Sequence, residues 1–145
     1  QLVADWQWPV PTRVVHSDFL RTTQTAAHVA ARFGLVPSVD TRLRERNFGE
    51  LEGLSDEHYP SIWAFDAEDA EHQHHGVEAL SRVASRMQAV IGDWEQQVSG
   101  EIILFVSHGD PLQILLTALA GKPLTSHREQ TPLAPASITL YGHGV

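Results

Sequence analysis

The sequence contains no cysteine, few basic residues and no long apolar run, and each absence narrows the chemistry open to the protein. Without cysteine the chain forms no disulfide, builds no thiolate metal site and has no cysteine nucleophile. No stretch approaches the roughly 18 uninterrupted apolar residues of a membrane helix, and Gln1 to Trp8 lack the basic and then apolar pattern of a signal peptide. We therefore expect a soluble protein without a membrane partner, and the cytoplasm is its default compartment.

Acidic residues outnumber basic ones, 18 Asp and Glu against 10 Lys and Arg, which gives a formal net charge of −8. Binding along a nucleic acid needs a concentrated field of positive charge, so we expect no nucleic-acid partner. Three arginines, Arg42, Arg44 and Arg46, would share one side of an extended segment and could attract a small anion, although Glu45 and Glu50 interrupt them. A small phosphorylated substrate fits this pattern better than a polymer.

The chain length predicts a single domain. The 145 residues, 42% of them hydrophobic, suffice for one compact core and are too few for two ordinary domains, so we assign residues 1–145 to one domain. The sequence begins with Gln1 rather than Met, and we expect the domain to be incomplete on its amino-terminal side. One core accounts for all the apolar segments, which leaves the oligomeric state open.

Segments typical of strands and helices alternate along the chain. The β-branched residues of Thr12–His16 predict a strand, and the alanine-rich Thr22–Phe33, followed by Gly34, predicts a helix. Apolar residues recur at three- and four-residue spacing between Leu80 and Trp94, which predicts an amphipathic helix. The continuous apolar run Glu101–Ser107 predicts a strand buried on both faces.

The remaining segments complete an α/β pattern. Pro111 suits the first turn of a helix over Leu112–Ala120, Ala136–Tyr141 predicts a last strand, and Val39–Arg46 predicts a short extended piece. Residues 47–76 predict a long excursion with one or two helical turns. The alternation indicates a three-layer α/β/α sandwich around a largely parallel sheet. In such sheets ligands bind beyond the carboxyl ends of strands, where Ser17 and His108 are expected.

His108 and Arg21 are the first candidates for binding an anion. His108 follows a buried strand, Gly109 lets a ligand approach the backbone, and the next helix offers unpaired N–H groups. Arg21 follows the other strand, and its planar guanidinium can grip two phosphate oxygens. By themselves, a histidine that caps its strand and a solvated surface arginine explain these residues as well.

Five segments resemble, in order, the motifs of the histidine phosphatase, or phosphoglycerate-mutase-like, superfamily. Ser17 to Ala26 is similar to the family's S-x-L-x-R-A-x-Q-T-A, and Leu43 to Gly53 is similar to its L-x-E-x-x-x-G-x-x-E-G. Gly76 to Glu78, with Arg86 downstream, is similar to the family's G-G-E-S segment and its following arginine. Val106 to Gly109 is similar to its V-S-H-G segment, and Ala136 to Leu140 is similar to its final strand. Each match alone is weak, but together they cover nearly the whole chain.

The resemblance implies a phosphoglycerate-mutase-like fold and a histidine-acid-type phosphatase that acts through a phosphohistidine. On the matching positions, Arg21 would hold the phosphate, His108 would donate to a phosphoryl oxygen, and Glu45 would protonate the leaving oxygen. Glu45 would then need a pKa raised by burial. No metal or other cofactor is implied, since arginine and histidine side chains would supply the charge. The substrate-binding residues expected beside Arg21 are Ser17, Asn47, Gly109 and Asp110.

The sequence departs from the family in lacking the R-H-G segment that carries the nucleophilic histidine. That segment precedes all the matched residues, so we expect the nucleophile upstream of this chain, and an inactive protein where it is truly absent. His143 also follows a strand, but Gly142 stands where arginine would be needed, and His16 is a weaker substitute still. Because Val77 and Ala79 replace residues that are usually Gly and Ser, the sequence assigns no catalytic duty to Glu78.

Structural roles compete with several of these predictions. Glu45 could pair with a neighbouring arginine, and Asp110 could cap a helix. The His72–His75 cluster raises metal binding, but two adjacent histidines in a polar loop do not close a tetrahedral zinc site, so we expect a solvated loop.

Three functions remain open: a phosphatase, a mutase of the same family, and a module of the same fold that binds a phosphorylated ligand without catalysis. The resemblance implies that mutases of this group carry a longer insertion after the loop with Glu45, so the short segment Leu54–His75 between two matched blocks favours the phosphatase. We expect this segment, with Tyr59, Trp63 and Phe65, to cover the pocket and to select the substrate's non-phosphate end.

Overall fold

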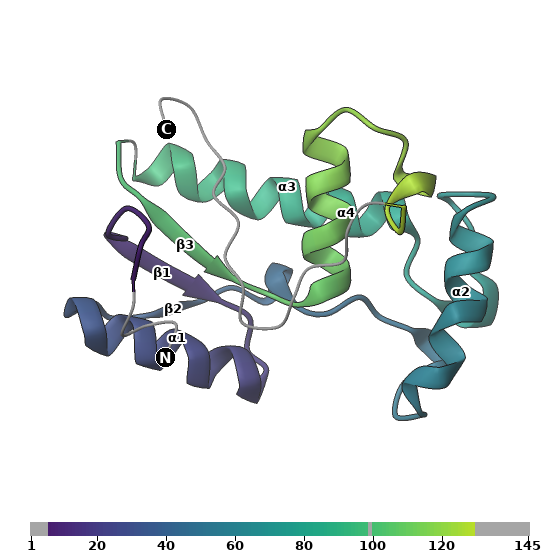
Figure 1. Ribbon diagram of the computed structural model, residues 1–145, viewed down its shortest axis with the longest axis horizontal. Coiled ribbons are helices and arrows are strands. Elements are labelled where there is room, and N and C mark those ends of the chain that lie inside the picture. The colour runs from purple at the N-terminus through teal and green to yellow at the C-terminus, as the bar shows by residue number, and fades with distance from the viewer. Residues whose placement is uncertain (1–5, 99, 130–145) are drawn as a thin grey trace.

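The structure is a computed structural model that describes residues 6–98 and 100–129. The predicted last strand, Ala136–Tyr141, and His143 lie outside these residues. The strands and α-helices are, in chain order, β1 (Arg13–His16), α1 (Leu20–Phe33), β2 (Ser38–Val39), α2 (Tyr59–Asp66), α3 (Leu80–Gln97), β3 (Ile103–Val106) and α4 (Gly109–Leu119) (Figure 1).

The described strands form one parallel sheet in the order β2-β1-β3. His16 pairs with Val106 and Val15 with Ser38, so β1 lies in the middle and its carboxyl end is level with that of β3. Helices connect the parallel strands, as this topology requires. The prediction of a largely parallel α/β sheet is confirmed.

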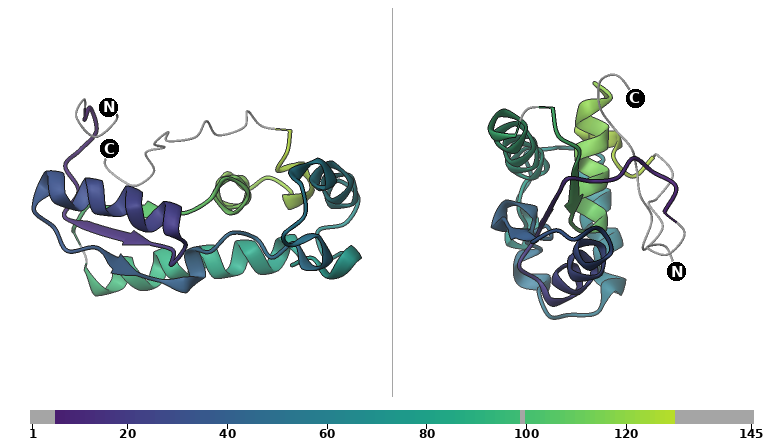
Figure 2. Two further views of the ribbon diagram at one scale, coloured as in Figure 1. Left: turned by 90° about the horizontal axis from the view of Figure 1, so that it is seen from below. Right: turned by 90° about the vertical axis from the view of Figure 1, so that its left-hand side faces the viewer.

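Alternating side chains divide the sheet into two faces with separate apolar clusters. On one face Val14 packs with Ala26 and Val29 of α1. On the other, Val15 packs with residues of α3 and α4, among them Met87 and Ile114. Figure 2 shows α1 and α3 on opposite sides of β1. The molecule therefore has the three layers that the sequence predicted.

The predicted helices are present with small shifts at their ends. α1 starts two residues before the predicted Thr22 and ends at Gly34, whose left-handed backbone (φ 67°) lets its N–H bond to the carbonyl of Ala30. α4 starts three residues before the predicted Leu112, because His108 adopts the extended backbone of an N-cap and Pro111 fits the first turn.

Two strand predictions need correction. The segment Val39–Arg46 is not extended throughout, because Asp40 accepts a hydrogen bond from the backbone N–H of Arg42 and starts a 3-10 turn. β3 has both faces covered, as predicted, but its residues are only partly buried because it stands at the edge of the described sheet.

The connection between β2 and α3, residues 40–79, is the irregular part of the molecule. It contains α2, whose second residue is Pro60, and several 3-10 turns. The backbone at Gly49 packs directly against the backbone at Gly76 there, because a Cβ on Gly49 would lie 2.4 Å from the backbone of Gly76. The predicted long excursion with one or two helical turns is thus confirmed. Among the described residues, no helix combines the length and the apolar character that crossing a bilayer requires.

Candidate active site

The carboxyl ends of β1 and β3 bring Ser17 and His108 into contact. The Ser17 hydroxyl lies 2.9 Å from Nε2 of His108 and 2.5 Å from the hydroxyl of Thr22. Thr22 in turn donates to the Ser17 carbonyl at 3.0 Å. Sequence reasoning had assigned Thr22 no role, although it stands beside Arg21 in the first matched segment. These contacts fix the His108 ring at the end of the sheet.

His108 is neutral at neutral pH. Burial, followed by the charges of Arg21 and Arg86, lowers its pKa to about 4. The ring is shielded on one side by Phe19, which packs edge-on with ring centroids 4.8 Å apart. A neutral imidazole has one N–H. With Thr22 donating to the Ser17 carbonyl, Nε2 of His108 donates this N–H to the Ser17 hydroxyl, so a ligand oxygen accepts it where the ligand takes the place of Ser17.

Glu45 has the properties of a general acid. Burial raises its pKa to about 7, and the nearby Asp110 carboxylate acts in the same direction. The backbone N–H of Arg46, which donates to Oε1 at 3.0 Å, and the charges of Arg21 and Arg86 oppose this rise. The pKa of Glu45 therefore lies close to neutral pH, where a proton donor is most useful.

The alternative that Glu45 pairs with a neighbouring arginine is wrong. Arg44 forms two hydrogen bonds with the carboxylate of Asp18, at 2.8 and 2.6 Å. Arg46 points to the buried carboxylate of Asp66. Within the described part of the chain, no ion pair involves Glu45, which leaves its carboxyl available to a ligand.

The predicted anion patch of Arg42, Arg44 and Arg46 is also wrong. Arg42 pairs with Asp40 at 2.9 Å and with Asp93 at 2.5 Å. The three guanidinium groups therefore form ion pairs with different carboxylates, because the segment turns instead of staying extended.

Arg21 supplies the cation of the site. It is exposed in the first turn of α1, and its charge lowers the pKa of both Glu45 and His108, which places it within electrostatic reach of the two. Across residues 6–98 and 100–129, Arg21 has no carboxylate partner. The cation of Arg21 is thus within electrostatic reach of the other two predicted catalytic residues and is free for an anionic ligand.

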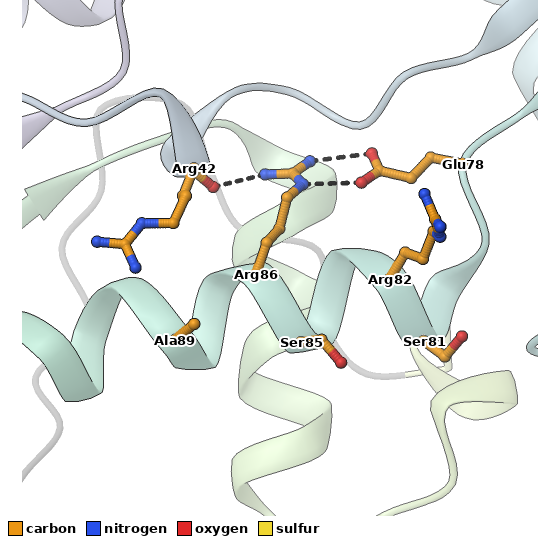
Figure 3. A pocket seen from close by; sticks show the side chains of 7 residues that line it. All are labelled: Arg42, Glu78, Ser81, Arg82, Ser85, Arg86 and Ala89. Atoms are coloured by element: carbon orange, nitrogen blue, oxygen red, sulfur yellow. Dashed lines mark hydrogen bonds and ion pairs between the residues drawn. The ribbon is translucent and has the colours of Figure 1, made fainter.

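Arg86 and Glu78 hold the backbone that carries Glu45. Arg86 donates to the carbonyls of Arg42, Arg44 and Glu45 at 2.6, 2.9 and 3.2 Å. Its Nε and Nη2 bond to the Glu78 carboxylate at 2.8 and 3.1 Å (Figure 3). The resemblance had pointed to this arginine, but only the structure shows that it fixes the loop before Glu45.

A cavity of about 260 Å³ lies next to Glu45. Aromatic side chains of the β2–α3 connection form one wall, and residues of α4 form another. Tyr59 and Trp63 belong to the wall, as predicted for the segment that covers the pocket, but Phe65 stacks on His74 instead. The lining residues are Glu45, Phe48, Tyr59, Trp63, Gly109, Asp110, Gln113 and Arg128.

The predicted substrate-binding residues differ in where they lie. Gly109 and Asp110 line the cavity beside Glu45. Asp110 is not a helix cap, because its carboxylate accepts from Nε1 of Trp63 and from Arg128, both at 3.3 Å. Asn47 is exposed, is not among the lining residues, and accepts the N–H of Gly49 at 2.8 Å, which gives it a role in the local turn.

A wider hollow of about 530 Å³ lies along the outer side of α3, around Arg86 (Figure 3). Neither Glu45 nor His108 lines it, so it is separate from the site at the sheet. Its lining residues are Arg42, Glu78, Ser81, Arg82, Ser85, Arg86 and Ala89.

The His72–His75 cluster is not a uniformly solvated loop. His74 and His75 are exposed, as expected, but His72 is buried and bonds to the Asp66 carboxylate. In the part of the chain that the structure describes, no group of three or more His, Cys, Asp or Glu side chains could hold a metal ion. The burial of His72 depends on a carboxylate six residues earlier, which no local pattern indicates.

The comparisons with known proteins agree with this geometry. A family model of the histidine phosphatase superfamily, branch 1, matches residues 2–144. The chain belongs to this superfamily.

Individual histidine phosphatases show similarity over most of the chain. The chain is 30% identical over 145 residues to the glucosyl-3-phosphoglycerate phosphatase of Mycolicibacterium vanbaalenii, and the aligned region covers 92% of the chain and 64% of the relative. The chain is also 32% identical over 125 residues to the probable phosphoglycerate mutase GpmB of Yersinia pestis, and that aligned region covers 81% of the chain and 57% of the relative. The chain therefore spans less than two thirds of these relatives.

The fold agrees with a solved histidine phosphatase. A mycobacterial glucosyl-3-phosphoglycerate phosphatase in complex with VO3 matches with a TM-score of 0.74 and 29% identity, over 88% of the chain and 66% of that protein. The predicted family and fold are thus confirmed. The R-H-G segment upstream and the roles of the individual site residues stay predictions.

Proposed function

We propose that this chain is the greater part of a phosphatase that hydrolyses a small phosphorylated metabolite through a phosphohistidine. The observation that carries the proposal is a half-buried Glu45 carboxyl, with a pKa of about 7, within electrostatic reach of the unpaired Arg21, which also acts on the neutral His108. The phosphatases among its relatives support the reaction class. The cytoplasm is the proposed compartment.

In the first step, a histidine from a segment upstream of this chain attacks the phosphorus. The nitrogen–phosphorus bond forms as the bond to the leaving oxygen breaks, and Glu45 gives its proton to that oxygen. Arg21 and the N–H of His108 stabilise the charge on the phosphoryl oxygens, so no metal is needed. In the second step, water attacks the phosphohistidine, Glu45 takes the proton from the water, and inorganic phosphate leaves.

The cavity beside Glu45 would hold the alcohol half of the substrate. Trp63 and Tyr59 form its aromatic wall, and the open space around Gly109, where a Cβ would meet nothing within 4 Å, leaves room near the start of α4. Ser17 would act by orienting His108. Exchanging the segment Leu54–His75 for that of a relative should change the preferred substrate, and an unchanged preference would refute this role.

A phosphoglycerate-mutase-type transfer is the second candidate, because the chain also resembles a probable phosphoglycerate mutase. The two reactions differ in product. A phosphatase releases inorganic phosphate, whereas a mutase returns an isomeric phosphate ester. The products formed by the full-length protein from a phosphoglycerate separate the two.

The decisive assay uses the full-length protein, with any residues that precede Gln1, and a generic phosphate monoester. We expect phosphate release that a chelator does not reduce, and a phosphoenzyme that is stable to base and labile to acid. Binding of inorganic phosphate without turnover in a protein that carries the upstream R-H-G segment would overturn the proposal and favour a binding module.

The role of Glu45 is tested by Glu45→Gln with esters of good and poor leaving groups. The variant should lower kcat/KM by about 100-fold for an alkyl phosphate, whose leaving oxygen needs a proton, and much less for 4-nitrophenyl phosphate. Glu68→Gln, an exposed change of the same charge in the same connection, is the control and should behave as the parent. Equal losses for both esters would contradict the assignment.

A further inference from the structure

Asp66, the last residue of α2, is a fully buried carboxylate with every acceptor position in use. Oδ1 accepts from Nη2 of Arg46 at 2.9 Å and from Nε2 of His72 at 2.6 Å. Oδ2 accepts from Nη1 of Arg46 at 2.8 Å and from Nε2 of His127 at 2.9 Å. The Arg46 and Asp66 side chains are 0% and 1% exposed, so this ion pair is shielded from water.

The hydrogen bonds fix the protonation of this cluster. His72 accepts the backbone N–H of His74 on Nδ1 at 3.2 Å, so its other nitrogen carries a proton and donates to Asp66. Burial alone would raise the pKa of Asp66, but hydrogen bonds from His127 and Arg46 hold it well below its ordinary value. Asp66 is therefore ionised and can only accept, which makes His127 a donor as well.

The bonds to Asp66 join segments that are far apart in the sequence. Arg46 comes from the loop after β2, His72 from the loop after α2, and His127 from the segment after α4. The backbone carbonyl of His127 accepts from Gln113 of α4 at 2.7 Å, while its buried Nδ1 has no hydrogen-bond partner. Within the described residues, the bond to Asp66 is thus the only hydrogen bond that the His127 side chain makes.

Two residues link this cluster to the candidate active site. Arg46 follows Glu45, and its backbone N–H donates to the Glu45 carboxyl at 3.0 Å. Trp63 lies on α2, one helical turn before Asp66, lines the cavity, and donates a hydrogen bond to Asp110, which lines it too. A shift of Asp66 would therefore move the proton donor through Arg46 and the cavity wall through Trp63.

Stability alone is a weak reason for such a cluster, because the cost of removing two charges from water offsets much of their attraction. An apolar contact would join the same segments. What the charged cluster adds is direction, since a planar guanidinium that bonds to both oxygens of one carboxylate allows few orientations.

We propose that Asp66 is a positioning residue for proton transfer to the leaving group: through Arg46 it holds Glu45, and through α2 it holds the Trp63 wall of the cavity. The inference rests on the proposed phosphatase function and deepens it. Asp66 touches neither the substrate nor the reacting atoms. It acts by keeping the acid within reach of the leaving oxygen.

The test compares Asp66→Asn with Asp69→Asn in the full-length protein. Asp69 is exposed, lies three residues away and loses the same charge. We measure kcat/KM, which covers the steps up to the first phosphoryl transfer, for an alkyl phosphate and for 4-nitrophenyl phosphate. Asp66→Asn should lower the alkyl value by about 100-fold, as expected for an acid displaced by ~1 Å, and the aryl value much less. Asp69→Asn should leave both unchanged.

A second pair of variants covers the case in which Asp66→Asn does not fold. His127→Leu removes one donor to Asp66, and His127→Gln keeps an N–H near the same position. The ratio of the alkyl to the aryl value should fall in His127→Leu and recover in His127→Gln. A purely structural role would instead lower both esters equally, because it reduces only the amount of folded protein, and that result would overturn the proposal. A parent protein inactive on both esters would instead overturn the proposed function.

Discussion

The two sides of the candidate active site are held by different means. On the phosphate side, Ser17, Arg21 and His108 stand where parallel strands end and helices begin, so the sheet register places them. On the acid side, Glu45 lies in the irregular β2–α3 connection, which ion pairs of Arg46 with Asp66 and of Arg86 with Glu78 hold in place. Regular secondary structure thus places the residues proposed to bind phosphate, whereas the position of the proposed proton donor depends on partners that are distant in sequence.

The largest effect should come from the phosphate side. Arg21→Ala removes its unpaired cation from an exposed position, so we expect the fold to persist and kcat/KM to fall about 1000-fold, as for other arginines that neutralise a transferred phosphoryl group. Inhibition by inorganic phosphate should weaken in parallel. Arg32→Ala, an exposed change at the other end of α1, is the control. Wild-type kinetics in Arg21→Ala would mean that the cation faces solvent only.

The acid side should show a conflict between function and stability. Burial raises the pKa of Glu45 from 4.5 to about 7, so ionising it disfavours the folded state. Its contribution to stability is full below pH 4.5 and is lost as the pH rises through about 7. Glu45→Gln should therefore unfold like the parent at pH 4.5 and be more stable by about 3 kcal/mol at pH 8.

Urea unfolding at the two pH values measures this difference. Glu68→Gln, with its exposed carboxyl, should show no such gain. Equal stabilities of Glu45→Gln and the parent at pH 8 would mean that the Glu45 carboxyl is solvated, and the contrast between the two sides would then disappear.

A smaller effect should separate two aromatic residues of α2. Trp63 lines the cavity, whereas Phe65 stacks on His74 outside it. Trp63→Ala should raise KM about tenfold with little change in kcat, because it removes binding shared by substrate and transition state. Phe65→Ala should leave KM unchanged. Similar changes in both variants would show that α2 as a whole, and not its cavity face, affects the substrate.

The smallest effect should come from the opposite end of the sheet. Arg13 pairs with Glu101 at 3.2 Å, with side chains 45% and 32% exposed. Arg13→Gln should lower the free energy of unfolding by about 0.5 kcal/mol, since water and salt screen exposed pairs. Chemical denaturation checks it. A loss as large as that of a buried pair would remove the distinction between surface charges and the buried charges around Glu45.

Sequence patterns predicted the regular half of the molecule because the signals there are local. Apolar periodicity marked α3, Gly34 marked the end of α1, and Pro111 marked the start of α4. The register of two parallel strands then placed Ser17 beside His108, as expected for ligand sites at the carboxyl ends of strands.

The irregular half could not be predicted in the same way. Asp66 binds Arg46, 20 positions away, and His127, 61 positions away, and no short motif contains such pairs. The same reason explains the wrong expectations for His72 and for Arg44 and Arg46, whose partners Asp66 and Asp18 only the fold brings near. Glu45 itself was found through its resemblance to a family motif, while its burial needed the structure.

The most direct test of Glu45 as the general acid is the pH dependence of kcat/KM for an alkyl phosphate in the full-length protein and in Glu45→Gln. The ionisation of the ester, with a pKa of about 6, affects both proteins equally. We expect the parent to lose activity as the pH rises through about 7, because Glu45 gives up its proton there, and the variant to lack this decline. The same decline in both proteins would contradict the assignment of Glu45 as the acid.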